Sequence, residues 1–432
     1  MIRRIKGTYD ILPEEAEKWQ KIEDVMRKVA RIFNFKEIRT PIFEASELFH
    51  RSVGESSDIV KKETYDFEDR GKRFNTLRPE GTAPIARAVI ENKLYADPSQ
   101  PQKLYYFGPM FRYERPQKGR QRQFHQFGAE IIGSASPLVD VEIINFALTY
   151  LKALGIEDVV VKVNSLGDKS SKENYTEVLK AYLEPNIDEL CQDCQRRHVE
   201  NPLRVLDCKV DQNNPIVLNA PKPVDYLSDE AKYHFDHVIS GLESLELDFE
   251  IDGNLVRGLD YYTHTVFEIQ SQSDLLGSQS TLVGGGRYNH LIETLGGPDT
   301  PAVGFAFGAE RLLLALEDSP VLESEAGIHA YFISLDNIFA NEGLKIINDL
   351  RMGGILVDYD FLKRSLKAQF KQADRLNAKF YLIYGEKEAI EGMINVKNSE
   401  TGEQESVKVD DLYDYLLKQL KGGGCSSGCG GC

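Results

Sequence analysis

The chain has 432 residues, of which 41% are hydrophobic and 28% charged, and its 52 basic and 68 acidic side chains give a net charge of −16. This composition excludes a collagen-like, disordered or membrane protein, and the length predicts two or three domains. The acidic excess argues against a protein that coats nucleic acid unselectively, although it leaves room for a local basic cleft. Because no apolar stretch suits a secretory signal or a membrane span, we expect a cytoplasmic protein.

The first elements in chain order are a helix over 14–33 and a strand over 36–43. Apolar residues recur at helical spacing in the first segment, and Asp10 and Pro13 supply start signals for the helix. Pro41 marks the strand as an edge or irregular strand, because proline cannot donate a hydrogen bond to a ladder.

Two apolar-rich segments, 105–113 and 123–133, predict a hairpin with a long loop. Because side chains alternate between the faces of a strand, Arg112 and Glu114 share one face, as do Gln126, Gly128 and Glu130. Gly128 would leave an open place where a small ligand could approach the sheet. One floor of the sheet would then carry carboxylates, an amide and a guanidinium.

The loop of this hairpin is strongly basic. It carries four cations within eight residues, Arg115, Lys118, Arg120 and Arg122. Such a loop predicts an electropositive projection on an acidic chain. A solvated hairpin tip with ordinary surface charge is the alternative interpretation.

Two further clusters lie around strands predicted in the second half. Arg257, Asp260, Tyr261 and Tyr262 crowd together just before a strand over 263–270. The glycine-rich segments 284–290 and 304–311 follow, and the second leads through Arg311 into a helix over 310–316. Glycine turns let backbone approach a phosphate or a ring closely. The P-loop and Rossmann fingerprints are absent from the sequence, which argues against those nucleotide sites.

The chain divides by pattern into two domains and a tail. A strand-rich first domain over 1–325 contains an inserted, mostly helical segment over 168–245. From 327 to 421, short strands (330–335, 355–359, 380–384) alternate with helices (339–351, 362–377, 410–420), and a two-stranded ribbon lies around 398–403. The glycine- and cysteine-rich end, 422–432, has no large apolar residue that could dock and predicts a flexible tail.

The six cysteines do not suggest a disulfide scaffold, but three of them cluster in the insertion. Cys191, Cys194, His198 and Cys208 offer ligand types that zinc prefers, although their spacing fits no common zinc template. Reduced and merely buried thiols are the alternative, so no metal is assigned. The tail cysteines, Cys425, Cys429 and Cys432, could bind a soft metal but have no supporting shell.

Taken together, these segments resemble the histidyl-tRNA synthetases, which are class II aminoacyl-tRNA synthetases, from Gly7 to about Leu420. Segments 35–41, 111–114 and 304–311 resemble the three class II motifs. Specificity for histidine is carried by segments 77–82 and 257–262, the second of which resembles a signature peculiar to the histidyl enzymes. The resemblance implies an α+β catalytic domain on a mostly antiparallel sheet, with the helical insertion, and a C-terminal α/β anticodon-binding domain.

The resemblance also implies roles for individual residues. The substrate histidine would contact Glu80, Gly81, Thr82, Gln126, Glu130, Tyr261 and Tyr262. ATP would contact Arg112, Glu114 and Arg311, and the catalytic cations at the α-phosphate would be Arg257 and Arg112. The reaction needs positioning and cations rather than a nucleophilic side chain, and Mg²⁺ bridging the phosphates would assist it.

The implied partners are L-histidine, ATP, histidine tRNA and a second copy of the chain in a homodimer. The tRNA acceptor end would meet Arg115, Gln117, Lys118, Arg120 and Arg122, and the anticodon domain would present Lys363, Arg364, Lys367, Lys371 and Arg375 along one helical stretch. A non-catalytic paralogue, the regulatory subunit of ATP phosphoribosyltransferase, is the alternative function. Such paralogues typically lack the C-terminal domain and lose substrate residues, whereas this chain has both.

Overall fold

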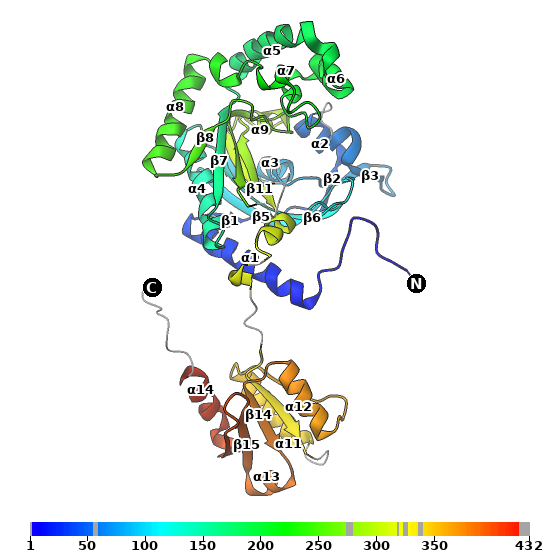
Figure 1. The fold of residues 1–432 in the computed structure, drawn as a ribbon, viewed down its shortest axis with the longest axis vertical. Helices are drawn as coiled ribbons and strands as arrows, with labels where there is room; N and C mark the ends of the chain where they lie inside the picture. The colour runs from blue at the N-terminus through cyan, green and yellow to red at the C-terminus, as the bar shows by residue number, and fades with distance from the viewer. Residues whose placement is uncertain are drawn as a thin grey trace. The chain divides into compact units, whose positions relative to one another are not determined.

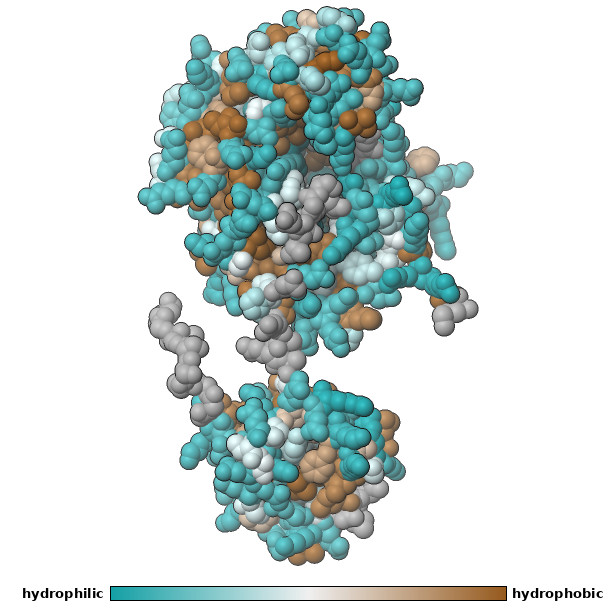
Figure 2. Space-filling model, viewed as in Figure 1, coloured by the Kyte–Doolittle hydropathy of each residue, from teal (hydrophilic) through white to brown (hydrophobic). Residues whose placement is uncertain are grey.

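The computed structural model describes residues 2–54, 59–273, 280–317, 319–322, 327–335 and 340–422. It divides into two compact units, Met1–Glu323 and Ser324–Cys432 (Figure 1). The predicted tail after Gly422, with its three cysteines, lies outside the described residues. No described helix has both the length and the apolar character needed to cross a membrane. The visible faces of both units are mostly hydrophilic, with separate hydrophobic areas (Figure 2).

The first unit is built on an eight-stranded sheet with the order β1-β5-β6-β11-β10-β9-β7-β8. Its strands are β1 Lys36–Glu37, β5 Gln102–Phe111, β6 Gln123–Ile132, β7 Val159–Ser165, β8 Phe249–Ile251, β9 Thr263–Ser271, β10 Thr281–Arg287 and β11 Ala302–Gly308. Only the outermost pairs, β1 with β5 and β7 with β8, are parallel. The predicted mostly antiparallel sheet is therefore confirmed, as is the hairpin of β5 and β6.

Helices cover both faces of this sheet. One face packs against α1 (Pro13–Ile32), α4 (Leu138–Ala153), α8 (Asp229–Ser244) and α10 (Ala309–Ala315), and the other against α3 (Thr82–Glu91) and α9 (Leu291–Thr294). The alternation along β6 divides its residues between the two faces. Phe127, Ala129 and Ile131 enter the core with α1 and α4, so Gln126 and Glu130 face α3.

The segment predicted as one strand over 36–43 is divided between two sheets, which corrects that prediction. The edge strand β1 is only two residues long, and the chain re-forms a strand after Pro41 as β2 (Phe43–Ala45). This strand joins β4 (Phe74–Leu77) and β3 (Tyr65–Glu68) in a three-stranded sheet, and α2 (Ser46–Val53) follows it. A proline lacks the N–H that a ladder requires, which explains the break.

Helix α1 begins close to its predicted start. Leu12 is its N-cap residue, and no side chain caps the helix, so Asp10 does not serve as the predicted cap. Pro13 fits the first turn, where a helix has no use for the missing N–H.

The inserted segment is mostly helical and has its own core. Of the helices within the predicted bounds 168–245, α5 (Lys169–Leu183), α6 (Gln192–Glu200) and α7 (Pro215–Leu218) gather at one end of the first unit (Figure 1), whereas α8 packs on the sheet. Tyr175, Leu179 and Val205 pack in one cluster with Val256 and Tyr262. The insertion therefore supports the segment that leads into β9.

The second unit alternates strands and helices as predicted. Its sheet has the order β13-β12-β14-β15-β16, with β12 Ala330–Ser334, β13 Val357–Tyr359, β14 Phe380–Tyr384, β15 Met393–Asn398 and β16 Gln404–Lys408. Its helices are α11 Ala340–Met352, α12 Leu366–Arg375, α13 Glu386–Glu391 and α14 Leu412–Gly422. The short helix α13 was not predicted.

Helix α12 is shorter than the predicted helix over 362–377. Lys363 has a φ of +51°, and the backbone N–H of Arg364 donates to the Asp360 carboxylate before the helix begins at Leu366. The five cations expected along one helical stretch are therefore divided, because Lys363 and Arg364 belong to the preceding turn. Only Lys367, Lys371 and Arg375 lie on the helix.

Candidate active site

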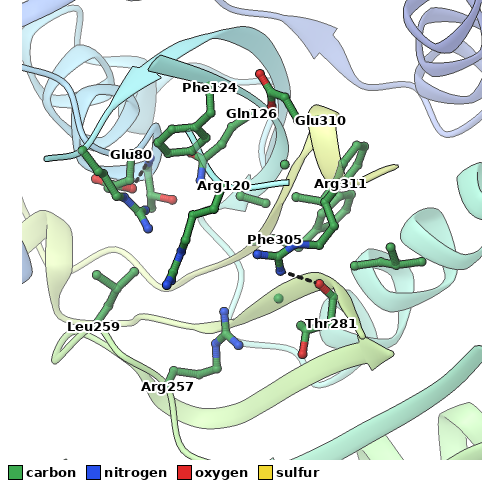
Figure 3. Close-up of a pocket in the computed structure, with 18 of the residues that line it drawn as sticks. Glu80, Arg120, Phe124, Gln126, Arg257, Leu259, Thr281, Phe305, Glu310 and Arg311 are labelled. Atoms are coloured by element: carbon green, nitrogen blue, oxygen red, sulfur yellow. Dashed lines mark hydrogen bonds between the residues drawn. The ribbon is translucent and has the colours of Figure 1, made fainter. Parts of the chain in front are cut away.

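One pocket brings together most of the predicted site residues. It lies on the α3 side of the sheet and holds about 1020 Å³ of empty space, part of it open to solvent (Figure 3). Predicted residues in its wall are Glu80, Thr82, Arg112, Glu114, Arg120, Gln126, Arg257, Tyr261, Tyr262 and Arg311. Segments far apart in the sequence thus form one site.

Glu80 and Thr82 lie at the N-terminus of α3. The Glu80 carboxylate accepts hydrogen bonds from the backbone N–H groups of Thr82, at 2.6 Å, and Ala83, at 2.8 Å. Burial nevertheless raises the pKa of Glu80 above its ordinary value. A carboxylate is favourable at a helix N-terminus, so α3 fixes this group beside the pocket.

Glu130 lies behind the pocket wall rather than on it. It is fully buried, and it accepts hydrogen bonds from the hydroxyls of Thr82, at 2.8 Å, and Tyr288, at 2.6 Å. Burial raises the pKa of Glu130 to about 8, so the group is largely protonated at neutral pH. Each Glu130 oxygen thus already has one protein partner, and the group lies beneath two residues of the pocket wall.

A wall of tyrosines flanks Gln126. The rings of Tyr261 and Tyr262 lie 4.8 Å apart, and that of Tyr288 lies 5.7 Å from Tyr261. Gln126 presents a buried side-chain oxygen that no donor reaches within the part of the chain that the structure describes. A buried acceptor without a donor is costly, so this oxygen is free to accept a hydrogen bond from a group in the pocket.

The space predicted over Gly128 is already filled. A β-carbon on Gly128 would collide with the Tyr106 ring, and one on Gly81 would collide with the same ring. Neither glycine is among the residues of the pocket wall, and the filled space corrects the open place expected at Gly128. The two glycines are needed because this ring lies between β6 and the start of α3.

Arginines form the other half of the pocket. The Nε of Arg112 donates to the Pro79 carbonyl at 2.8 Å, and Nη1 of Arg311 donates to the Thr281 carbonyl at 2.7 Å. Figure 3 shows the guanidinium groups of Arg120, Arg257 and Arg311 turned toward a common central space. Burial, with the nearby charge of Arg120, lowers the pKa of Arg311. Such a group of half-buried cations favours a polyanion.

Arg257 is held by Glu268, a residue without a predicted role. The two form an ion pair, and the Glu268 carboxylate also accepts from the Thr281 hydroxyl at 2.8 Å. Gly284 lies directly across from Glu268 in the sheet, and the guanidinium of Arg257 lies over it. The register of β9 and β10 therefore places Glu268 beside the Arg257 guanidinium. The sequence does not give this register, so the role of Glu268 could not be predicted from it.

The basic loop does not project all of its cations. Arg120 pairs with Glu114, and the Arg122 guanidinium lies 3.9 Å from the centre of the Tyr113 ring. Glu114 and Arg112 lie after the end of β5, so strand alternation does not apply to them as predicted. Outside the pocket wall, the exposed residues of the predicted tRNA contact are Arg115, Gln117 and Lys118.

The predicted zinc set is only partly brought together. His198 lies 2.6 Å from a carboxylate oxygen of Glu184 and is not a member of the cysteine cluster. Asp211 occupies the fourth place instead, next to the three cysteines of the insertion. Of the four candidate ligands named from the sequence, the structure therefore brings together the three cysteines and not His198.

Comparison with known proteins defines the class. The Histidyl-tRNA synthetase family model matches residues 7–312, and the Anticodon binding domain model matches residues 329–419. A crystal structure of apo histidyl-tRNA synthetase from S. aureus has a TM-score of 0.83 at 41% identity and covers 96% of this chain and 100% of its own. The fold is accordingly that of a class II aminoacyl-tRNA synthetase.

Curated relatives give the particular family. A histidine–tRNA ligase 2 of Bacillus cereus is 49% identical over 96% of this chain and 98% of its own length, and a histidine–tRNA ligase of Bacillus velezensis is 50% identical with the same coverage. The chain belongs to the histidyl-tRNA synthetase family, and it is an enzyme that ligates histidine to tRNA.

Proposed function

We propose that the tyrosine-walled half of the pocket binds the substrate histidine. The observation that carries the proposal is the buried, unpartnered oxygen of Gln126 in the same wall as the Glu80 carboxylate. An α-ammonium group supplies donors for Gln126, Glu80 and the Thr82 hydroxyl. The imidazole would then lie against Tyr261 and Tyr262.

Glu130 takes a supporting part in this proposal. Its hydrogen bonds from Thr82 and Tyr288 fix two residues of the pocket wall. Gly81 contributes by admitting the Tyr106 ring rather than by touching the substrate.

The arginine half would bind ATP, which is a substrate of this family. Arg112 and Arg257 would stabilise negative charge at the α-phosphate, while Arg311 would meet the γ-phosphate and Glu114 the adenine side. The histidine carboxylate attacks the α-phosphorus, and the bond to pyrophosphate breaks as the histidyl-adenylate forms. A hydroxyl of the 3′-terminal adenosine of tRNA then attacks the adenylate carbonyl and releases AMP. Fixed cations beside the reacting phosphate lower the barrier without reorganisation.

Two carboxylates that could hold Mg²⁺ lie beside this half. Glu114 is in the pocket wall and Glu268 pairs with Arg257, and carboxylate oxygens are the ligands that magnesium prefers. When bound there, magnesium would neutralise charge on the phosphates.

Arg115, Gln117 and Lys118 would contact the tRNA acceptor end, since they are the exposed members of the basic loop. Arg120 and Arg122 would contribute indirectly by shaping that loop on Glu114 and Tyr113. The second unit would bind the anticodon, in keeping with its matching family model. We further propose that the protein is a homodimer in the cytoplasm. Light scattering, which gives the molar mass in solution, tests the dimer. Nothing in the described residues favours the regulatory-subunit alternative.

Histidine-dependent exchange of pyrophosphate into ATP tests the proposal. The Arg257→Ala variant should fold and bind histidine with little change while exchanging pyrophosphate about 100-fold more slowly, because one fixed cation at the reacting phosphate is lost. Histidine binding is measured separately by calorimetry. An equal exchange rate in this variant would remove the role given to Arg257, and absence of exchange in the folded parent protein would refute the whole proposal.

A further inference from the structure

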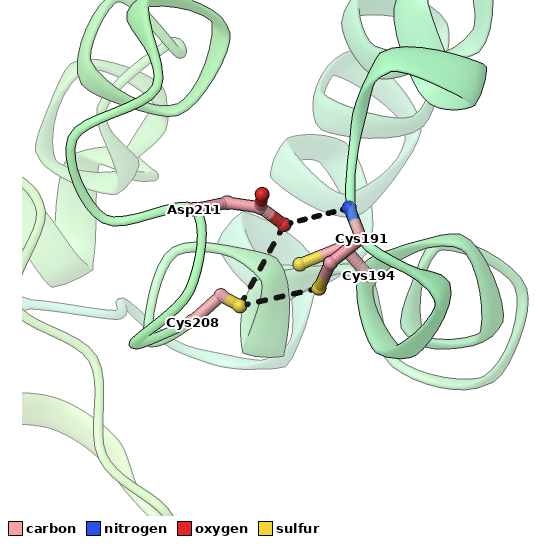
Figure 4. A group of neighbouring side chains, drawn as sticks. All are labelled: Cys191, Cys194, Cys208 and Asp211. Carbon is pink, nitrogen blue, oxygen red and sulfur yellow. Dashed lines mark hydrogen bonds between the residues drawn. The ribbon is translucent and has the colours of Figure 1, made fainter.

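Three cysteines and one aspartate of the insertion form a compact, largely buried cluster. Cys191 lies just before α6, and Cys208 and Asp211 lie in the loop that follows the short helix Pro202–Val205 (Figure 4). The Sγ atoms of Cys191 and Cys208 are 3.6 Å apart, and Cys208 Sγ lies 3.7 Å from Asp211 Oδ2. One potential ligand atom from each of the four residues lies within 4.8 Å of all the others.

These distances suit a tetrahedral ion rather than a disulfide. Zinc with Zn–S bonds of about 2.3 Å separates its sulfur ligands by roughly 3.8 Å. A disulfide would place two sulfurs about 2.05 Å apart, and the three thiols in the described chain are all free. Cys194, Cys208 and Asp211 are buried, and the two cysteines belong to the hydrophobic core of the insertion. Burying a carboxylate in such a core is costly unless hydrogen bonds or a bound cation compensate its charge.

The sequence spacing becomes regular once Asp211 replaces His198. The four residues then read Cys-x2-Cys, thirteen intervening residues, and Cys-x2-Asp. Two pairs of ligands, each separated by two residues, are the arrangement of zinc sites built from two turns. The backbone N–H of Cys191 donates to Asp211 Oδ2 at 3.0 Å, so the carboxylate is already oriented toward the first turn.

We propose that Cys191, Cys194, Cys208 and Asp211 bind one structural Zn²⁺ ion that closes the insertion on itself. Three thiolates and a carboxylate are all ligands that zinc accepts, and four protein ligands leave no open position for chemistry. On binding, the thiols release their protons and the metal forms three bonds to sulfur and one to oxygen.

The ion would fix the chain between Cys194 and Cys208. Two residues of this stretch donate hydrogen bonds to the segment 257–262 of the active site. Nη1 of Arg204 donates to the Gly258 carbonyl, and Nδ2 of Asn201 donates to Asp260 at 2.9 Å. Gly258 follows Arg257 directly, so loss of zinc should loosen the catalytic arginine. This consequence for activity rests on the proposed function, whereas zinc binding itself does not.

The test is a metal analysis of the full-length chain with Cys425, Cys429 and Cys432 changed to serine, so that tail thiols cannot contribute. We expect about one zinc ion per chain after dialysis, and less than about a tenth of that in the Cys194→Ser and Asp211→Asn variants. The matched control is His198→Gln, which removes the other candidate ligand and should retain the ion.

Cobalt and thiol chemistry provide a second measurement that does not depend on variants. Protein refolded with Co²⁺ alone should show thiolate-to-cobalt charge-transfer absorption, and the three insertion thiols should react with a disulfide reagent only after chelation. Absence of bound metal, an oxidised cysteine pair, or full zinc content in Asp211→Asn would each overturn the site. Loss of zinc from His198→Gln would overturn the assignment of the fourth ligand.

Discussion

Replacing Gly284 with alanine should displace the Arg257 guanidinium without removing its charge. A β-carbon at Gly284 would lie 2.1 Å from Arg257 Nη2 and 2.6 Å from Cζ, both well inside the 3.4 Å at which ordinary contact begins. The atoms in the way belong to the end of a flexible side chain, so the backbone of β10 can remain in place. The guanidinium must therefore retreat by about 1.3 Å from the position in which Glu268 holds it.

The size of the effect follows from that displacement. A misplacement of about 1 Å at a reacting centre can cost roughly 100-fold in rate, and about 2.7 kcal/mol corresponds to that factor. We expect the Gly284→Ala variant to lose about 10- to 100-fold in histidine-dependent pyrophosphate exchange. The affinity for histidine should change little, because the displaced group belongs to the phosphate half of the pocket.

Steady-state exchange kinetics and calorimetric binding of histidine measure these two quantities separately. Gly258→Ala is the matched control, since a β-carbon there makes only ordinary contact, 3.5 Å from Arg204. An unchanged exchange rate in Gly284→Ala would refute the reasoning, because it would show that the position of Arg257 does not limit activation.

Two other predictions concern stability and tRNA. Burial raises the pKa of Asp140, but the Arg287 guanidinium outweighs this effect and holds the pKa at about 2. The ionised carboxylate should therefore contribute about 2 kcal/mol of stability above pH 4, and this contribution should be lost as the pH falls toward 2. Asp140→Asn should cost about 3–5 kcal/mol at pH 7, because it leaves a buried guanidinium unpaired; urea unfolding followed by the fluorescence of Trp19, the only tryptophan, measures this in the first unit. The double change Arg115→Glu and Lys118→Glu should raise the KM for tRNA several-fold and leave pyrophosphate exchange unchanged, because both side chains are exposed outside the pocket.

A specific measurement would contradict the stability prediction, and another would contradict the tRNA prediction. The stability argument fails if Asp140→Asn and the parent protein lose the same free energy of unfolding between pH 4 and pH 2. For the loop, Lys169→Glu is the control, because this exposed lysine of α5 lies outside the basic loop. A rise in KM for tRNA as large in the control as in the loop variant would mean that net charge, rather than the loop, governs binding.

The elements that depend on local pattern were predictable, and the arrangement within the pocket was only partly so. The β5–β6 hairpin follows from apolar runs around a polar loop, and Gln126 faces the pocket as its position in β6 requires. Glu130 shares that face but is covered by Thr82 and Tyr288, which arrive from other elements. A single-strand pattern gives the face of a residue and not what lies on top of it.

The contacts of Asp211 in the insertion and of two arginines in the basic loop could not be predicted, because they too depend on the folded chain. Asp211 was missed because spacing was tested with His198, and only the folded loop brings the carboxylate to the three thiols. Arg120 and Arg122 were predicted to project because charged loops are usually solvated, whereas Glu114 and Tyr113 draw them back. Ion pairs formed across a loop depend on its conformation, which composition alone does not specify.

Because of the ring of Tyr106, the effect of a substitution at Gly81 or Gly128 depends on which residue occupies position 106. Gly81 and Gly128 look replaceable by alanine, since one precedes a helix and the other lies within a strand, yet a methyl group at either would collide with this ring. Truncation of Tyr106 would in turn leave a void beneath the substrate pocket. Alanine at either glycine should therefore be tolerated only in a background where residue 106 is already small, which is a case of sign epistasis built by steric exclusion.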